Sequence, residues 1–268
     1  MALALDVQGH RGTRGYLPEN TLPAFKRALD LGVTTLELDT GVTKDGVVVV
    51  HHDRRLNPDV ARGPDGQWVK APAPTLYSLT FAELQRYDVG RIRPGSEYAQ
   101  RFPQQQPLDG TRIPKLADLF ALAGQTNVRF NIETKLLPTH PDETVGPDDF
   151  ARALIGEIRK ARLERRTTIQ SFDYRTLKIV EREAPEIETV YLTEAEHSIP
   201  TKVQAAGAKI WSPDFRALSK ETVDEAHRLG LRIVAWTVNE PGDIKRMIDW
   251  GVDGIISDYP DRVLQQKK

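Results

Sequence analysis

The 268-residue sequence contains no cysteine. Disulfides, thiolate zinc sites, iron–sulfur clusters and cysteine nucleophiles are therefore excluded. The sequence also lacks an excess of either charge, because 37 Lys and Arg residues stand against 38 Asp and Glu residues, and no basic run is present. Nucleic acid is consequently not expected as a partner, since binding to a phosphate backbone needs clustered positive charge.

Long apolar runs are missing as well. No stretch reaches the roughly 18 apolar residues that a membrane-spanning helix requires, so no membrane span is predicted. The first expected strand begins near residue 4, which leaves too little room before it for a secretory signal. The sequence leaves the compartment open: cytoplasmic, or periplasmic or secreted if a signal was removed. It also leaves the oligomeric state open.

Short apolar runs typical of strands alternate with helical patterns along most of the chain. The expected strands cover residues 4–9, 33–39, 127–133, 167–171, 187–192, 208–212, 231–236 and 253–257. The expected helices cover residues 20–31, 148–162, 173–183, 200–206, 219–229 and 241–249, with a last helical turn after Pro260. About eight such units predict an α/β fold, a closed (β/α)₈ TIM barrel. An open doubly wound sheet is disfavoured because no GxGxxG follows the first strand.

Two features interrupt this alternation after the second strand. Asp45-Gly46 lies between two valine-rich runs and predicts a β-hairpin. Residues 54–115 are rich in Pro, Gly, Gln and Arg and contain one helical candidate near 80–87. A long irregular insertion of this kind is usually a functional lid or a mobile loop. We therefore expect one barrel domain over residues 1–268 that carries this insertion.

Acidic residues gather where the second and third expected barrel strands end. Glu37 and Asp39 are two residues apart and so share one face of a strand, while Glu133 ends the next strand. The carboxyl ends of barrel strands meet at one rim, where three carboxylates would repel each other unless a divalent cation lay between them. Oxygen ligands favour Mg²⁺ or Ca²⁺ over Zn²⁺.

Other polar residues follow the same strand ends. His10 and Arg11 follow the first strand, the pair His52-Asp53 follows the hairpin, and Lys135 follows Glu133. Each of these alone has a plain structural interpretation, as a turn residue, an ion-pair partner or a solvated strand face. Their joint occurrence at successive strand ends favours an active site.

The sequence resembles the glycerophosphodiester phosphodiesterase family over nearly its whole length. The matching strings, in family order, are HRG at 10–12, PENT at 18–21, ELD at 37–39, TKDG at 43–46, HHD at 51–53, ETK at 133–135, AWTVN at 235–239 and SDYP at 257–260. The stretch after Asp53 and the long insertion resemble the larger bacterial branch. The resemblance implies a TIM barrel and a small-molecule substrate, a glycerophosphodiester hydrolysed to glycerol 3-phosphate and an alcohol.

The resemblance also implies a role for individual residues. The metal-binding carboxylates would be Glu37, Asp39 and Glu133. The general acid and base would be His10 and His52, with His52 rather than His51 matching the family's His-Asp pair. The phosphate-contacting cations would be Arg11 and Lys135, and the aromatic residue of the substrate pocket would be Trp236.

Other functions fit the same sequence features. A phospholipase-D-like lyase acting on lysophospholipids or sphingomyelin would have a similar barrel and metal triad. A non-catalytic barrel that binds phosphorylated polyols is disfavoured, because both histidines and all three carboxylates are present. A metal-independent phosphoinositide-cleaving barrel would not need three acids at one rim.

Overall fold

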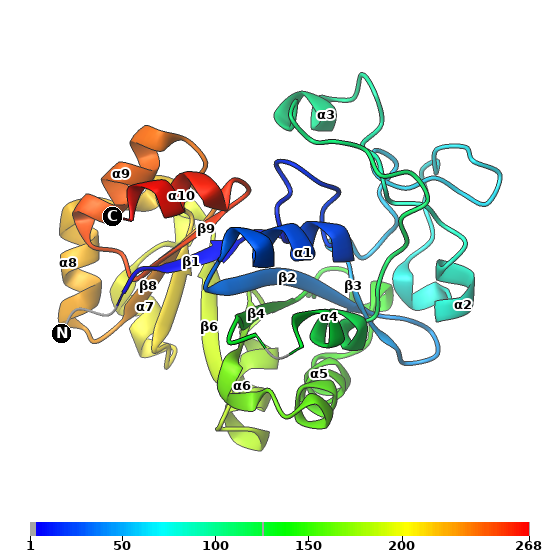
Figure 1. The fold of residues 1–268 in the computed structure, drawn as a ribbon. Helices are drawn as coiled ribbons and strands as arrows, with labels where there is room; N and C mark the ends of the chain where they lie inside the picture. Colours follow the sequence, from blue (N-terminus) through cyan, green and yellow to red (C-terminus); the bar gives the residue numbers. More distant parts are fainter. Residues whose placement is uncertain (1–3, 125, 268) are drawn as a thin grey trace.

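Eight parallel strands pair side by side until the last of them meets the first (Figure 1). The computed structural model describes residues 4–124 and 126–267. The barrel strands are β1 (Asp6–Gly9), β2 (Thr35–Val42), β4 (Arg129–Thr134), β5 (Thr167–Ser171), β6 (Glu188–Thr193), β7 (Ile210–Pro213), β8 (Arg232–Ala235) and β9 (Gly254–Ser257). β1 pairs in parallel with both β2 and β9, which closes the sheet. The predicted barrel is confirmed.

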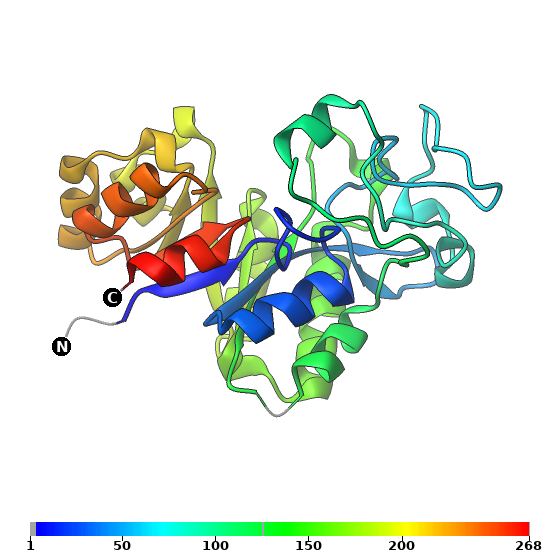
Figure 2. The ribbon, with the colours of Figure 1, turned by 45° about the horizontal axis from the view of Figure 1, so that its top comes forward.

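Helices follow the strands and cover the outside of the barrel (Figures 1 and 2). They are α1 (Leu22–Leu31), α4 (Leu116–Ala123), α5 (Pro147–Ala161), α6 (Tyr174–Glu183), α7 (Pro200–Ala205), α8 (Lys220–Arg228), α9 (Pro241–Trp250) and α10 (Pro260–Gln266). Short 3₁₀ turns, η2 to η5, cover Pro141–Glu143, Glu164–Arg166, Ala195–His197 and Phe215–Ala217. Within the described residues, no helix combines the length and the apolar character that crossing a membrane would need.

Local sequence explains where most helices begin and end. Helix α1 buries Ala24, Phe25 and Ala28 against the barrel, and it stops at Gly32, whose φ of 82° few other residues adopt. Helix α4 was missed in the sequence, although Leu116 and Phe120 lie one helical turn apart and are both buried. It is only eight residues long and directly follows the irregular insertion, so its pattern is short.

The predicted hairpin is present and leads the chain away from the barrel. Strand β3 (Val48–Val50) pairs antiparallel with β2, and Gly46 in the connecting turn has a φ of 79°. β2 therefore runs three residues past its expected end at Asp39. The insertion then lies beyond the carboxyl end of β2 (Figure 1). It contains η1 (Leu76–Ser78), α2 (Phe81–Leu84) in the expected place, and α3 (Glu97–Arg101), which was not predicted.

The insertion packs around a small apolar core of its own. Its buried members are Val49, Leu56, Val60, Ala61, Ala73, Leu76, Leu84, Val89 and Ile113. These side chains come from residues spread over the whole segment and from β3, so the insertion is tied to the hairpin at its base. The chain returns to the barrel at α4.

The centre of the barrel contains a chain of buried polar side chains. The Nδ2 group of Asn131 donates hydrogen bonds to the Oε1 atoms of Gln8 and Gln170, each at 2.9 Å. Thr168 donates to Oδ1 of Asn131 at 2.9 Å. Gln170 in turn donates to Oε1 of Glu37 at 2.6 Å. This network connects the interior of the barrel with the carboxylate side chain at its rim.

We expect Asn131→Leu to destabilise the protein, because it leaves the polar groups of Gln8, Gln170 and Thr168 without their partner inside the barrel. Each buried group left unpaired costs about 1–3 kcal/mol, so urea unfolding should show a loss of at least about 2 kcal/mol. The exposed Asn127 offers a control, since Asn127→Leu should change stability by about 0.5 kcal/mol or less. Equal stability of the two variants would contradict a structural role for this network.

Candidate active site

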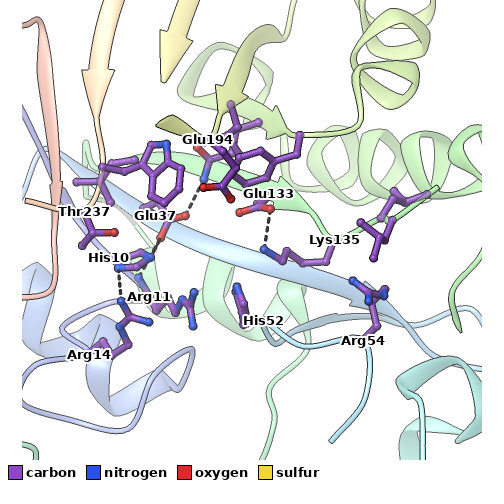
Figure 3. Close-up of a pocket in the computed structure, with 17 residues that line it drawn as sticks. His10, Arg11, Arg14, Glu37, His52, Arg54, Glu133, Lys135, Glu194 and Thr237 are labelled. Carbon is purple, nitrogen blue, oxygen red and sulfur yellow. Dashed lines mark hydrogen bonds and ion pairs between the residues drawn. The ribbon is translucent and has the colours of Figure 1, made fainter. Parts of the chain in front are cut away.

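A cavity of about 500 Å³ opens at the carboxyl ends of the barrel strands (Figure 3). Of the residues predicted from the sequence, those lining it are His10, Arg11, Glu37, His52, Glu133, Lys135 and Trp236. Asp39 does not line the cavity and is 1% exposed, but its carboxylate lies beside those of Glu37 and Glu133. The fold therefore brings together all the residues that the sequence singled out.

The three carboxylates come from two neighbouring strands. Glu37 and Asp39 alternate on β2, and Asp39 lies directly opposite Glu133 in the parallel register between β2 and β4. One oxygen from each of the three residues lies within 4.8 Å of the others, and all three side chains are buried. Oxygen ligands at this spacing fit one divalent cation. The cluster is thus a candidate metal site.

Burial and mutual repulsion perturb these carboxylates strongly. Burial, reinforced by Asp39, raises the pKa of Glu37 well above its ordinary value. Burial also raises the pKa of Glu133 to about 7, although the charge of Lys135 opposes this. Burial acts in the same direction on Asp39. The charge of Arg11, with smaller contributions from His52 and Lys135, nevertheless holds the pKa of Asp39 well below the usual range. Without a cation between them, burial and repulsion disfavour the state in which all three groups are charged. This supports the fit of a divalent ion.

Two basic side chains flank the cluster. Lys135 Nζ lies 2.7 Å from Oε1 of Glu133 and 3.6 Å from Oδ1 of Asp39. Nε of Arg11 lies 3.1 Å from Oδ2 of Asp39, although it makes no hydrogen bond of good geometry. In Figure 3 Arg11 lies nearer Glu37 and Lys135 nearer Glu133, so positive charge borders the cavity at two places.

The loop between β1 and α1 has an unusual backbone. Arg11 and Asn20 have φ values of 49° and 55°, in the left-handed region that side chains disfavour. Such residues cost about 1–3 kcal/mol each and persist only where surrounding contacts hold them. Here the Arg11 amide donates to Oε2 of Glu37 at 3.0 Å, and Asn20 Nδ2 donates to Oδ2 of Asp39 at 2.9 Å. The strained loop thus binds directly to the carboxylate cluster.

The two predicted histidines share one arrangement. Nδ1 of His10 lies 2.7 Å from Oδ1 of Asp258, and Nδ1 of His52 lies 2.7 Å from Oδ1 of Asp53. A carboxylate at Nδ1 favours the tautomer whose Nε2 lone pair is free. Nε2 of His10 lies 3.9 Å from Oε2 of Glu37, which places it at the edge of the cluster. His51 is buried but does not line the cavity.

The surroundings of both imidazoles lower their pKa and so favour the neutral ring while no substrate is bound. Burial, assisted by the charge of Arg14, lowers the pKa of His10 to about 4, although Asp258 opposes the shift. Burial and the charges of Arg11 and Lys135 likewise lower the pKa of His52. A neutral imidazole with its Nδ1–H held by a carboxylate can accept a proton at Nε2.

Trp236 forms part of the apolar wall of the cavity. Its ring contacts that of Phe172 edge to face, with centroids 5.7 Å apart, and its Nε1 donates to the carbonyl oxygen of Ser212 at 2.9 Å. Leu192 and Ile256 complete this side. The cavity therefore has a charged floor of carboxylates, histidines and cations, and one apolar wall suited to carbon atoms of a ligand.

Several residues of the site were not identified from the sequence. Asp258 orients His10, Arg14 donates to Oδ1 of Asp258 at 2.7 Å, and Gln170 supports Glu37. Asp258 directly follows the last barrel strand, so the same strand-end rule that selected Glu37 could have found it. Gln170 lies one residue before the end of β5, so the same rule could have indicated it as well. Arg14 lies three residues after Arg11, but nothing in the sequence shows that it pairs with Asp258.

Comparison with known proteins gives a consistent result. Residues 10–262 match the glycerophosphoryl diester phosphodiesterase family. A glycerophosphodiester phosphodiesterase of Caldanaerobacter subterraneus subsp. tengcongensis is 32% identical over 262 residues, which cover 96% of each chain. A candidate glycerophosphoryl diester phosphodiesterase from Silicibacter pomeroyi DSS-3 is 36% identical, with a TM-score of 0.93 over 100% of this chain and 94% of that one.

A third protein shares the fold at lower identity. The phosphodiesterase OLEI02445 of Oleispira antarctica, solved in complex with the product sn-glycerol-3-phosphate, is 23% identical with a TM-score of 0.77. The match covers 97% of this chain and 95% of that one. The family match spans nearly the whole chain, and relatives above 30% identity cover it almost completely. The chain therefore belongs to the glycerophosphoryl diester phosphodiesterase family, and it is a phosphoric diester hydrolase.

Proposed function

We propose that this chain hydrolyses glycerophosphodiesters to glycerol 3-phosphate and an alcohol, with His10 and His52 as the acid–base pair. The observation that carries the proposal is the meeting, at the floor of one cavity or directly behind it, of two carboxylate-paired imidazoles, three clustered carboxylates and two cations. The phosphodiesterase of Oleispira antarctica, which shares the fold, binds sn-glycerol-3-phosphate as product. That ligand supports the assignment of the substrate class.

Glu37, Asp39 and Glu133 would hold a divalent cation, Mg²⁺ or Ca²⁺, because their ligand atoms are all carboxylate oxygens. When bound, the cation would polarise the phosphoryl group and offset the charge of the three carboxylates. The protein's own contribution is to fix these groups before substrate arrives. Gln170, Asn20 and the Arg11 amide each hold one carboxylate oxygen in place.

Arg11 and Lys135 would contact the non-bridging oxygens of the phosphate. Negative charge grows on those oxygens as the nucleophile attacks, and cations already in place stabilise it without further reorganisation. The guanidinium of Arg11 can present two parallel N–H groups to two oxygens, which a lysine cannot. Trp236 and Phe172 would pack against the carbon atoms of the glycerol group, on the apolar wall of the cavity.

Proton transfer falls to the two histidines. The 2-hydroxyl of the glycerol group would attack phosphorus, releasing the alcohol and forming a cyclic phosphate that water then opens. One imidazole starts neutral and accepts the proton of the attacking hydroxyl at Nε2. The other must start as the imidazolium, protonated at both nitrogens, so that its Nε2 can donate a proton to the leaving oxygen. The carboxylate at each Nδ1, Asp258 or Asp53, stabilises its imidazole while that ring carries the additional proton.

We expect His10→Ala and His52→Ala each to lower kcat by about 10²–10⁴-fold, because each removes one positioned acid or base. Release of glycerol 3-phosphate from glycerophosphocholine, glycerophosphoethanolamine and glycerophosphoglycerol would measure the effect, with unfolding followed in parallel. His140→Ala is the matched control, since His140 is exposed and does not line the cavity. A histidine whose removal leaves most of the activity in place has no part in the mechanism.

A second substrate class is favoured by a specific feature of the cavity. A further cavity of about 440 Å³ adjoins the first and shares Phe172, Leu192 and Glu194 with it. Its remaining walls are partly apolar and include Ile199 and Val203. An acyl chain attached to the glycerol group could occupy it, which would make lysophospholipids substrates as well.

This second candidate predicts that the enzyme cleaves short-chain lysophosphatidylcholine, and that Ile199→Asp lowers kcat/KM for that substrate. Each chain methylene moved from water into an apolar site gains up to about 0.8 kcal/mol, and a carboxylate at the wall removes part of that gain. Glycerophosphocholine, which has no chain, is the internal control and should be unaffected by the substitution. Equal effects on the two substrates, or no cleavage of the lysophospholipid, would remove this candidate and leave the first in place.

A further inference from the structure

The insertion reaches back to the loop that carries His10 and Arg11. Helix α3 lies near the loop between β1 and α1 in both views of the fold (Figures 1 and 2). Two backbone-directed hydrogen bonds join the two segments. Gln105 Nε2 donates to the carbonyl oxygen of Arg14 at 2.7 Å, and the Gln106 amide donates to the carbonyl oxygen of Tyr16 at 2.8 Å. We call residues 96–106, which include α3, the α3 segment.

One route leads from Tyr98 in this segment to Arg11. The Tyr98 hydroxyl donates a hydrogen bond to Oε2 of Glu19, and the other carboxylate oxygen of Glu19 accepts from Nη1 of Arg11 at 2.7 Å. The side chains of Arg11 and Glu19 are 10% and 9% exposed, so little solvent screens this pair. Tyr98 therefore fixes the carboxylate that holds the guanidinium of Arg11.

A second route leads from Phe102 to His10. The guanidinium of Arg14 lies over the Phe102 ring, with its central carbon 4.7 Å from the ring centroid. Nε of the same guanidinium donates to Oδ1 of Asp258 at 2.7 Å, the oxygen that also pairs with Nδ1 of His10. Nη1 of Arg14 lies 3.4 Å from the Tyr98 hydroxyl, which joins the two routes.

We propose that the α3 segment is a positioning element of the active site, in which Tyr98 acts through Glu19 on Arg11 and Phe102 acts through Arg14 and Asp258 on His10. Two observations favour this over a purely structural role. The two routes end on Arg11 and His10, polar side chains that line the cavity and lie outside the apolar core of the barrel. Arg11 also has a left-handed backbone, which needs surrounding contacts to persist.

The first test compares Tyr98→Phe and Phe102→Leu with matched controls from the far part of the insertion. Tyr87→Phe removes a hydroxyl from a ring that packs on the core of the insertion. Phe81→Leu removes a ring whose centroid lies 4.6 Å from Nζ of Lys115. A displacement of reacting groups by about 1 Å can lower the rate of reaction up to about 10²-fold. We therefore expect kcat to fall about 10- to 100-fold in Tyr98→Phe and Phe102→Leu. KM should change less than kcat, and both controls should keep the wild-type kcat.

The second test asks whether Tyr98 acts through Glu19. Glu19→Gln breaks the link to Arg11 and leaves α3 unchanged, so Tyr98→Phe should lower kcat little further in that background. Losses that multiply in the double variant would overturn the route. A wild-type kcat in the Glu19→Gln variant would also overturn the route. This single variant remains decisive even if Tyr98→Phe lowers Tm because the insertion loosens.

The inference rests on the proposed roles of His10 and Arg11, and its failure can be told apart from theirs. A wild-type enzyme that does not release glycerol 3-phosphate from any glycerophosphodiester would count against the proposed function. An active wild-type enzyme whose Tyr98→Phe and Phe102→Leu variants match the two controls would overturn the positioning role alone.

Discussion

Three buried carboxylates share one small volume at the rim of the barrel, and the rest of the site is arranged around the charge that they carry. Glu37, Asp39 and Glu133 are forced together by the parallel register of β2 and β4. Burial, reinforced by repulsion from Asp39, raises the pKa of Glu37 and Glu133. A site that holds three carboxylates close together, with Arg11 and Lys135 beside them, is suited to holding a metal ion and a phosphate together.

The surrounding structure restrains these groups from several directions. Inside the barrel, Asn131 and Gln170 connect polar side chains to Glu37. At the rim, the strained loop of Arg11 and Asn20 binds Glu37 and Asp39 through its amide and side-chain groups. Rigid support of this kind matters for catalysis because charge stabilisation depends on groups that are already in place when the reaction begins.

The sequence predicted the barrel and the charged groups at the strand ends because both are recorded locally, whereas the roles of Trp236 and the two histidines came from the resemblance to the family. Alternation along β2 shows that Glu37 and Asp39 share a face, and the barrel rule then brings Glu133 to the same rim. The pairing of particular side chains from distant parts of the chain carries no such signal. Asp258 stands at a strand end, but nothing in the sequence indicates that it pairs with His10, 248 residues away. Tyr98 reaches Glu19 from an insertion without periodic pattern. The left-handed backbone of Arg11 was equally invisible, since that conformation is set by tertiary contacts.

Anomalous diffraction from crystals soaked in Mn²⁺, a divalent ion that accepts the same oxygen ligands, tests most directly whether one cation binds among Glu37, Asp39 and Glu133. A single strong peak between these three carboxylates, lost in crystals of Glu133→Gln, is the expected result. A peak at another place in the molecule, or none at the rim under saturating Mn²⁺, would contradict the assignment of the carboxylate cluster as a metal site.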